Sequence, residues 1–270
     1  MSVVDIHPHV IAADIRRYPF APLGGKQSDW SRERPVDAEK MLAAMDEAGI
    51  EKSVLVQAST CYGHDNSYVA AAVAAHPERF AGVFSVDMLA ADAPWRILYW
   101  LGRGLKGLRV FIAGHTTSHD ARLDDPRSFP AWRCAVDAGL PVCVQLRAPG
   151  LPQLETLLTE FRDARIVLDH MARPAPDDAG SLFSLARYSN LFLKFTTHNV
   201  RDTAKAEIKP ETFMRRVVDA FGARRIAWGS NYPASEGSLP GLLAEARQTT
   251  SELPAGDQEW IFSRTAKSLY

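Results

Sequence analysis

The amino-acid sequence predicts an α/β protein built as a single (β/α)8 TIM barrel that takes up residues 1–270 as one domain. Three observations lead to this prediction. Eight short runs rich in β-branched residues recur along the chain, and each interval between them leaves room for a helix. No linker or change of composition divides the chain. Its length of 270 residues suits one barrel as well as two smaller domains, so the repeat favours the barrel.

The predicted elements alternate regularly from the first residues to the last. The strands are expected at residues 3–9, 52–58, 81–86, 107–111, 141–146, 165–170, 191–196 and 225–230. The helices are expected at residues 37–48, 66–75, 94–103, 129–138, 152–161, 180–187, 210–220, 239–250 and 257–269. Local signals agree with several boundaries, since Asp37 is suited to cap a helix and Gly49 and Gly139 to end one.

An open doubly wound sheet is the alternative architecture. It predicts a glycine-rich phosphate loop after the first strand, and the sequence has His-Pro-His there instead. The long connection that follows, residues 16–35, is expected to cover the mouth of the barrel, although a plain surface insertion would have the same length.

Composition narrows the classes of partner. The formal net charge is −1, with 46% hydrophobic and 23% charged residues, which implies neither nucleic acid nor another polyanion as a partner. The longest apolar runs are much shorter than the roughly 20 residues of a membrane span. The sequence shows no signal peptide and has three cysteines without metal-type spacing, so we expect a cytoplasmic protein without a disulfide framework.

Polar residues cluster where the first and sixth strands are expected to end. Asp5, His7 and His9 share one strand parity, and His170 closes the sixth predicted strand. Because barrels build their sites at the carboxyl ends of strands, the three imidazoles are expected to converge on a metal ion or a water molecule. The alternative is that they are unrelated polar residues at strand ends.

The eighth predicted strand continues into Trp-Gly-Ser-Asn-Tyr-Pro, residues 228–233. Gly229 permits a close approach of another group, and Asn231 has the same parity, so its side chain is expected to face the barrel mouth. Trp228 has the opposite parity and is expected to pack beneath the helices.

Together, the His-x-His pair, His170 shortly before Ala-Arg-Pro, and the 228–233 segment resemble the amidohydrolase-related TIM-barrel hydrolases. The resemblance is to the branch with 2-pyrone-4,6-dicarboxylate lactonase and sugar lactonases, and it runs from Val4 to Tyr270. It implies a hydrolase whose catalytic residues include His7, His9 and His170. Asn231 stands where many members have an Asp that acts as base or metal ligand, and asparagine cannot take a proton at neutral pH.

Two mechanisms remain open at this point. In one, His7, His9 and His170 bind a divalent metal such as zinc or manganese, which lowers the pKa of a bound water to about 7. In the other, no metal is used, the histidines polarise the carbonyl, and one of them is the general base. In the metal mechanism, Asn231 orients the water or the carbonyl.

Further residues are expected to bind the substrate, a small cyclic molecule that carries a carboxylate. The candidate polar contacts are Arg109, Gln145, Arg147, Lys194 and His198, and the candidate aromatic walls are Trp30, Tyr62 and Tyr232. Each cation is also a candidate for a structural ion pair.

The predicted function is therefore hydrolysis of a lactone or a related cyclic amide by water. A metal-dependent nonoxidative decarboxylase of an aromatic acid is the alternative enzyme, and that type resembles members that keep a fifth-strand His and an eighth-strand Asp. A barrel that binds a ligand without turnover is the third hypothesis.

Overall fold

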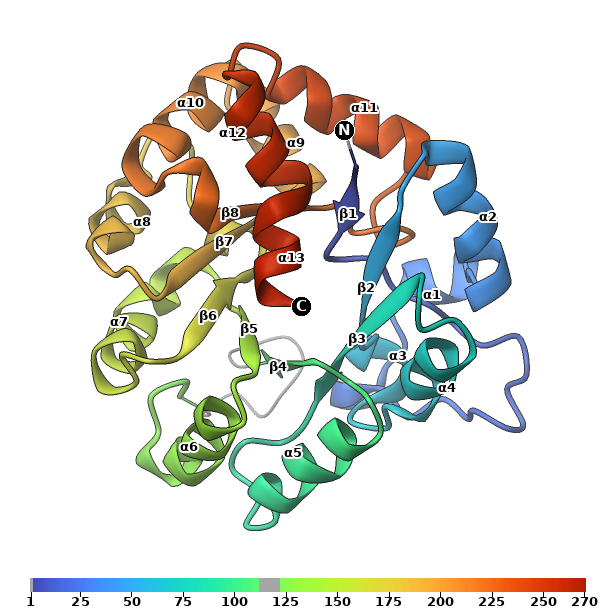
Figure 1. Cartoon of the computed structure of the whole chain (residues 1–270). Helices are drawn as coiled ribbons and strands as arrows, with labels where there is room; N and C mark the ends of the chain where they lie inside the picture. Colours follow the sequence, from blue (N-terminus) through green and yellow to red (C-terminus); the bar gives the residue numbers. More distant parts are fainter. Residues whose placement is uncertain (1, 112–121) are drawn as a thin grey trace.

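A computed structural model describes residues 2–111 and 122–270, and within them eight parallel strands form one barrel sheet (Figure 1). The strands follow one another in sequence order, each hydrogen-bonded to the next. This confirms the (β/α)8 prediction. The strands are β1 (Val4–Asp5), β2 (Lys52–Val56), β3 (Phe80–Ser85), β4 (Gly107–Phe111), β5 (Pro141–Gln145), β6 (Arg165–Leu168), β7 (Leu191–Thr196) and β8 (Ile226–Gly229).

The barrel closes between β1 and β8. Beyond the two residues of β1, the amide of Ile6 donates to the carbonyl of Trp228 at 3.1 Å. A Cβ at Gly229 would lie 2.5 Å from the Cβ of His7, so only glycine permits this approach. The predicted first strand over residues 3–9 is wrong in length, because the chain leaves the ladder after Asp5 and carries His7 and His9 in the loop that follows.

Helices surround the sheet, as Figure 1 shows. Their bounds are α1 (Asp29–Glu33), α2 (Ala38–Ala48), α3 (Ser59–Tyr62), α4 (Ser67–Ala75), α5 (Ala93–Gly102), α6 (Phe129–Asp137), α7 (Leu151–Glu160), α8 (Gly180–Ser184), α9 (Thr197–Lys205), α10 (Pro210–Phe221), α11 (Leu239–Thr249), α12 (Ala255–Glu259) and α13 (Thr265–Leu269). Asp37 caps α2 by accepting from the amide of Lys40, and Gly49 ends it at a φ of 66°. The sequence prediction missed α1, α3 and α9, and a π-helical turn at Trp260–Arg264 interrupts the predicted last helix.

The apolar core has two shells. Most buried apolar side chains lie between the sheet and the helices, including Trp228, which packs beside Phe262 as its parity predicts. A smaller cluster joins strand residues such as Val4 and Val83 to Ala266 and Leu269 of α13. The helix α13 therefore fills the barrel from the end where the strands begin, and in Figure 1 the C-terminus lies at the centre of the ring. This leaves the opposite end, where the strands finish, for a site.

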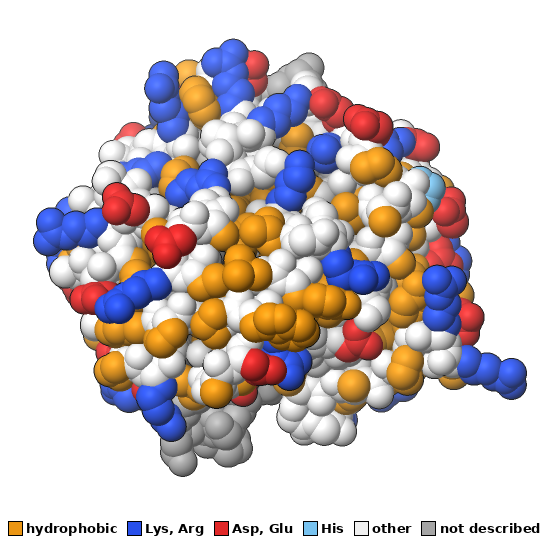
Figure 2. Space-filling model, turned by 60° about the horizontal axis from the view of Figure 1, so that its bottom comes forward, with side chains coloured by type: hydrophobic (Ala, Val, Ile, Leu, Met, Phe, Trp, Pro, Cys, Tyr) orange, Lys and Arg blue, Asp and Glu red, His pale blue; other side chains and the backbone are white. Residues whose placement is uncertain are grey.

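One outer face is unusually apolar. Helix α5 exposes Trp95, Leu98 and Tyr99, with exposed fractions of 63%, 54% and 41%. Figure 2, in which the bottom of the first view comes forward, shows apolar side chains gathered near the centre of that face. Among the described residues, no helix is both long and apolar enough to cross a lipid bilayer.

Candidate active site

Two histidines that follow β1 and a third from a distant part of the sequence, after β6, meet at the carboxyl ends of these strands. The rings of His7 and His9 have centroids 5.0 Å apart, and the ring of His170 lies 4.7 Å from that of His7. All three are buried, with no more than 7% of any of them exposed. The end of the barrel opposite α13 therefore holds a compact cluster of imidazoles.

His170 is held by an unusual turn. It and the next three residues, Met171 to Arg173, all have left-handed backbones, with φ between 48° and 59°. Such conformations cost about 1–3 kcal/mol each for residues other than glycine and persist where the surroundings enforce them. Asn199 supplies one restraint, because its Nδ2 donates to the carbonyl of His170 at 2.7 Å. Its Oδ1 accepts from the amide of Thr196 at 3.0 Å, which also caps α9.

The hydrogen bonds fix which ring nitrogen of His7 carries the proton. The Nζ of Lys194 lies 2.9 Å from Nδ1 of His7 and 2.8 Å from Oδ1 of Asp169. An ammonium group only donates, so Nδ1 of His7 accepts and the ring proton of the neutral side chain is on Nε2. This Nε2 is buried and has no hydrogen-bond partner in the described part of the chain. His7 therefore offers an unused N–H donor.

His9 and His170 have the opposite tautomer. Nδ1 of His9 lies 2.8 Å from the carbonyl oxygen of Val56, which can only accept, so Nδ1 is the protonated nitrogen. Nδ1 of His170 lies 2.9 Å from the hydroxyl of Thr196, which itself donates to Oδ1 of Asn199 at 3.3 Å. The hydroxyl must therefore accept from His170. In both rings the lone pair is on Nε2.

Burial keeps these rings uncharged. Desolvation, followed by the charge of Arg109, lowers the pKa of His9 to about 3. Desolvation also lowers the pKa of His170 far below its usual value, and desolvation with the charge of Lys194 does the same for His7. The three imidazoles are neutral at physiological pH, so the two lone pairs on Nε2 are available.

A charged layer lies directly beneath the imidazoles. Asp169 accepts from Nε of Arg109 at 2.7 Å and pairs with Lys194 on its other oxygen. Burial alone would raise the pKa of Asp169, but the charges of Lys194 and Arg109 lower it to about 2. The carboxylate therefore stays ionised 3.7 Å from Nδ1 of His7.

Asn231 lies on the far side of the cluster, with a left-handed φ of 57°. Its Nδ2 lies 3.3 Å from Nε2 of His198 and donates to the hydroxyl of Ser235 at 3.0 Å. The ring of His198 is in turn 4.9 Å from that of His170. Burial, with Arg173 next, lowers the pKa of His198 to about 4. Since both hydrogens of the Asn231 amide are used, its oxygen is left as an acceptor.

Several of these groups line a cavity of about 270 Å³ at the barrel mouth, and His7 lies buried behind its wall. Its walls combine imidazoles, one guanidinium, amides and two aromatic rings. The lining residues are His9, Trp30, Ala58, Ser59, Thr60, Arg109, Phe111, Gln145, His170, His198, Asn231 and Ala234. The volume suits a small molecule.

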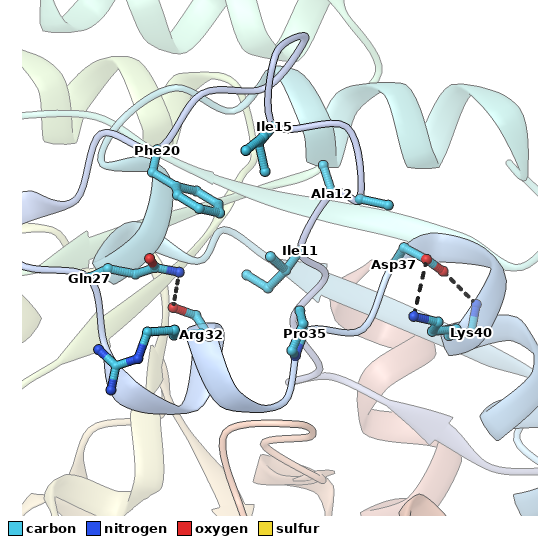
Figure 3. A pocket seen from close by; sticks show the side chains of 11 residues that line it. Ile11, Ala12, Ile15, Phe20, Gln27, Arg32, Pro35, Asp37 and Lys40 are labelled. Carbon is cyan, nitrogen blue, oxygen red and sulfur yellow. Dashed lines mark hydrogen bonds and ion pairs between the residues drawn. The ribbon is translucent and has the colours of Figure 1, made fainter.

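The first long connection contributes one wall, as its position in the sequence predicts. Trp30 on α1 lies 5.3 Å from the ring of His9, at an angle of 31°. On the other side of α1, Ser31 and Arg32 line a separate hollow of about 250 Å³. Figure 3 shows Ile11 and Phe20 at this second hollow, with the Asp37 and Lys40 pair at its edge. Helix α1 therefore separates two cavities.

The structure brings most of the predicted site residues to one cavity, but not all. His7 and Lys194 are completely buried and Arg147 is exposed, and none of these three lines the cavity. Tyr62 is 2% exposed, and its hydroxyl accepts from the amide of Ala12 at 2.7 Å. Tyr232 packs against the core outside the barrel. Three of these expected substrate contacts, Lys194, Tyr62 and Tyr232, instead have structural partners.

Sequence reasoning missed several residues that hold the site. They are Asp169, Thr196, Asn199 and Ser235, and each contacts one of the predicted residues. Of these residues, Asp169 was the easiest to predict from the sequence, since it directly precedes His170. Thr196 and Asn199 have the spacing of a helix-capping pair, which would also have indicated α9.

The donor set does not fit a metal ion bound by His7, His9 and His170. The only unused nitrogen of His7 carries a proton, so that ring has no lone pair to give. Arg109 and Lys194 place two positive charges next to the cluster, and Asp169 already pairs with both. In the described ranges, no three His, Cys, Asp or Glu side chains are grouped to hold a metal. The geometry therefore does not support the expected zinc or manganese site.

The chain is similar to several known proteins in sequence and in fold. A curated relative, L-fucono-1,5-lactonase from Burkholderia ambifaria, is 29% identical over 245 residues, which are 86% of this chain and 80% of the relative. A solved structure from Pseudomonas putida, named as a 2-pyrone-4,6-dicarboxylic acid hydrolase, has a TM-score of 0.80 and 20% identity. The match covers 99% of this chain and 97% of that one.

Another solved structure is an amidohydrolase from Burkholderia multivorans with bound zinc. It has a TM-score of 0.74 and 19% identity, and the match covers 100% of this chain and 99% of that one. Both structural likenesses show the fold. The sequence profile of the Amidohydrolase family matches residues 4–270, so the chain belongs to this family and is an enzyme of the amidohydrolase superfamily.

Proposed function

We propose that this enzyme hydrolyses a lactone by metal-free catalysis at the histidine cluster. The observation that carries the proposal is the division of tautomers among neutral, buried imidazoles beside one cavity. His7 offers an N–H, while His9 and His170 offer lone pairs. Hydrolysis of a cyclic ester needs both, a donor for the carbonyl oxygen and a base for the water. The names of the lactonase relative and of the pyrone hydrolase neighbour support the same reaction.

In the proposed reaction, a water molecule between His170 and Asn231 attacks the carbonyl carbon of the substrate. Nε2 of His170 takes a proton from the water as the new C–O bond forms, and the carbonyl electron pair moves onto its oxygen. The N–H of His7 and the guanidinium of Arg109 stabilise this oxyanion. When the intermediate collapses, the C–O bond of the ring breaks and His170 returns the proton to the leaving oxygen. The product is a hydroxy acid.

Two contacts favour His170 over His9 as the base. The ring of His170 lies beside His198, which Asn231 contacts, so a water at this side can be oriented by the free oxygen of Asn231. Thr196 also fixes the ring of His170, and the ionised Asp169 stabilises the imidazolium that forms. Asn231 thus orients the water and does not take its proton.

The surroundings favour a cyclic substrate with a carboxylate. The positive charges of Arg173, Arg147 and Arg201 act on His198 at the cavity wall, where Asp202, the ion-pair partner of Arg173, opposes them. Trp30 on the opposite side presents an aromatic face next to His9. A small ring can pack against the indole while its carboxylate points towards the arginines.

A substrate screen tests the proposal. Sugar lactones and carboxylated lactones are assayed by acid release, and aromatic acids by CO2 evolution, with His170→Gln as the matched inactive control. We expect acid release from at least one lactone and its loss in the control. CO2 evolution without lactone hydrolysis would instead show a decarboxylase, and melting shifts without turnover would show a binding barrel.

A further inference from the structure

Lys194 is completely buried next to the cluster, and its ammonium nitrogen has three polar neighbours inside the protein. The Nζ contacts Asp169 Oδ1 at 2.8 Å, His7 Nδ1 at 2.9 Å and Cys143 Sγ at 3.4 Å. The side chain has no exposed surface. With these three neighbours and no exposed surface, the ammonium group does not reach a substrate in the cavity.

We propose that Lys194 is a positioning residue that holds His7 as an N–H donor and thereby prevents the three histidines from becoming a metal site. The inference deepens the proposed function and rests on it, since it assigns the origin of the His7 tautomer. The ionised Asp169 fixes the ammonium group, and the ammonium group occupies the lone pair of Nδ1. Nε2 of His7 must then carry the ring proton.

Without the ammonium group, His7 has another partner within reach. Asp169 Oδ1 lies 3.7 Å from Nδ1 of His7 and loses its bond to Lys194 at the same time. A carboxylate only accepts, so the ring proton moves to Nδ1 and the lone pair to Nε2. A carboxylate behind an imidazole is the arrangement that orients metal-binding histidines. His7, His9 and His170 would then present three lone pairs on Nε2, which is a zinc-binding set.

The experiment compares wild type with Lys194→Met, Lys194→Arg and the surface control Lys209→Met. Histidine labelled with ¹⁵N reports by NMR which ring nitrogen carries the proton, and the signals of His7 are identified from His7→Gln. Zinc affinity is measured by calorimetry. Neither readout needs a substrate, so failure to find a lactone leaves this test intact.

In wild type and Lys209→Met we expect the His7 proton on Nε2 and no zinc binding at the cluster. Lys194→Met should move the His7 proton to Nδ1 and raise the zinc affinity at least tenfold. Residues that hydrogen-bond to metal ligands change metal affinity by about this much. Its kcat without zinc should fall about 10- to 100-fold with little change in KM, because Lys194 does not touch the substrate. Lys194→Arg, which keeps a donor, should retain the wild-type tautomer.

Two results would overturn the inference. One is a His7 proton on Nδ1 in the wild type, which needs no variant to be observed. The other is a folded Lys194→Met with unchanged tautomer and unchanged zinc affinity. If Lys194→Met does not fold, the tautomer of His7 in the wild type decides the question alone.

Discussion

At the scale of single residues, the three histidines differ only in what their second nitrogen touches. Lys194, Val56 and Thr196 provide an ammonium, a carbonyl and a hydroxyl, and these contacts divide the rings into one donor and two acceptors. The partners of the Nδ1 atoms, which do not line the cavity, thus determine whether each ring donates or accepts at Nε2.

Replacing the hydroxyl behind the base tests this division. Thr196→Val keeps the volume but removes the acceptor for Nδ1 of His170, so the ring loses its fixed tautomer. We expect kcat to fall about 10- to 100-fold with KM little changed, the scale for outer partners of a reacting group. Steady-state kinetics check this against Thr250→Val, a buried threonine directly after α11 whose hydroxyl donates to carbonyls of that helix. Equal rates in both variants would contradict the role of Thr196.

Asn231 allows a second test at this scale. Asn231→Ala should lower kcat about 10²–10³-fold, as the loss of one preorganised hydrogen-bonding group does. Asn231→Asp should place a carboxylate beside His198 and His170, and a negative charge raises the pKa of nearby imidazoles. We therefore expect the acid limb of the pH profile to move to higher pH in Asn231→Asp. An unchanged rate in Asn231→Ala would show that this residue is only structural.

At the scale of elements, the turn after β6 and the start of α9 form one unit. Asn199 caps α9 through its oxygen and restrains the left-handed turn through its nitrogen. The site depends on this unit because His170 is its first left-handed residue.

Two variants of Asn199 separate the roles. Asn199→Asp keeps the cap but loses the donor to His170, so we expect a lower kcat with modest loss of stability. Asn199→Ala loses both the cap and the donor to His170. The loss of the cap should lower the free energy of unfolding by about 0.5–2 kcal/mol more. Urea unfolding and kinetics on both proteins measure the two effects. Full activity in the folded Asp variant would show that the turn does not need this bond.

The same elements show the limits of sequence reasoning. The periodic strands and long helices were predictable because their apolar spacing is local. The two-residue β1 was overestimated because His7 and His9 continue the parity of a strand after its ladder has ended. The short α9 was missed because its apolar pattern is weak and its capping pair uses Asn in place of Glu or Gln.

At the scale of the whole molecule, the barrel brings together residues from β4 and β7 and from the segments that directly follow β1, β6 and β8. The sequence could indicate which strand ends carry histidines, since all strands of this fold end at the same side of the barrel. It could not indicate that Lys194 and Asp169 pair beneath them, or that Tyr62 bonds to Ala12, because such pairing depends on distances between distant segments.

The buried neutral histidines also predict how stability depends on pH. In the unfolded chain a histidine has a pKa of about 6.5. In the folded protein His9 and His198 have values of about 3 and 4, and His7 and His170 are also lowered. These histidines add to the free energy of unfolding in full above about pH 6.5. Their stabilisation is lost as pH falls, because the histidines of the unfolded chain take up protons first.

We therefore expect the free energy of unfolding to decrease from pH 7.5 to pH 5, measured by urea unfolding at constant ionic strength. The slope reaches at most about 1.4 kcal/mol per pH unit for each histidine. His198→Gln should reduce the slope, since it removes one of the histidines whose pKa is lowered by burial. Constant or rising stability towards pH 5 would contradict the burial of neutral imidazoles.

The most direct test of metal-free lactone hydrolysis is activity measured together with metal content. The protein is purified without a histidine tag, treated with a chelator and assayed on the lactone found in the screen, while its metals are determined by elemental analysis. The account predicts full activity with less than about a tenth of an equivalent of any divalent metal. Loss of activity on chelation, with recovery on adding one equivalent of zinc or manganese, would contradict it.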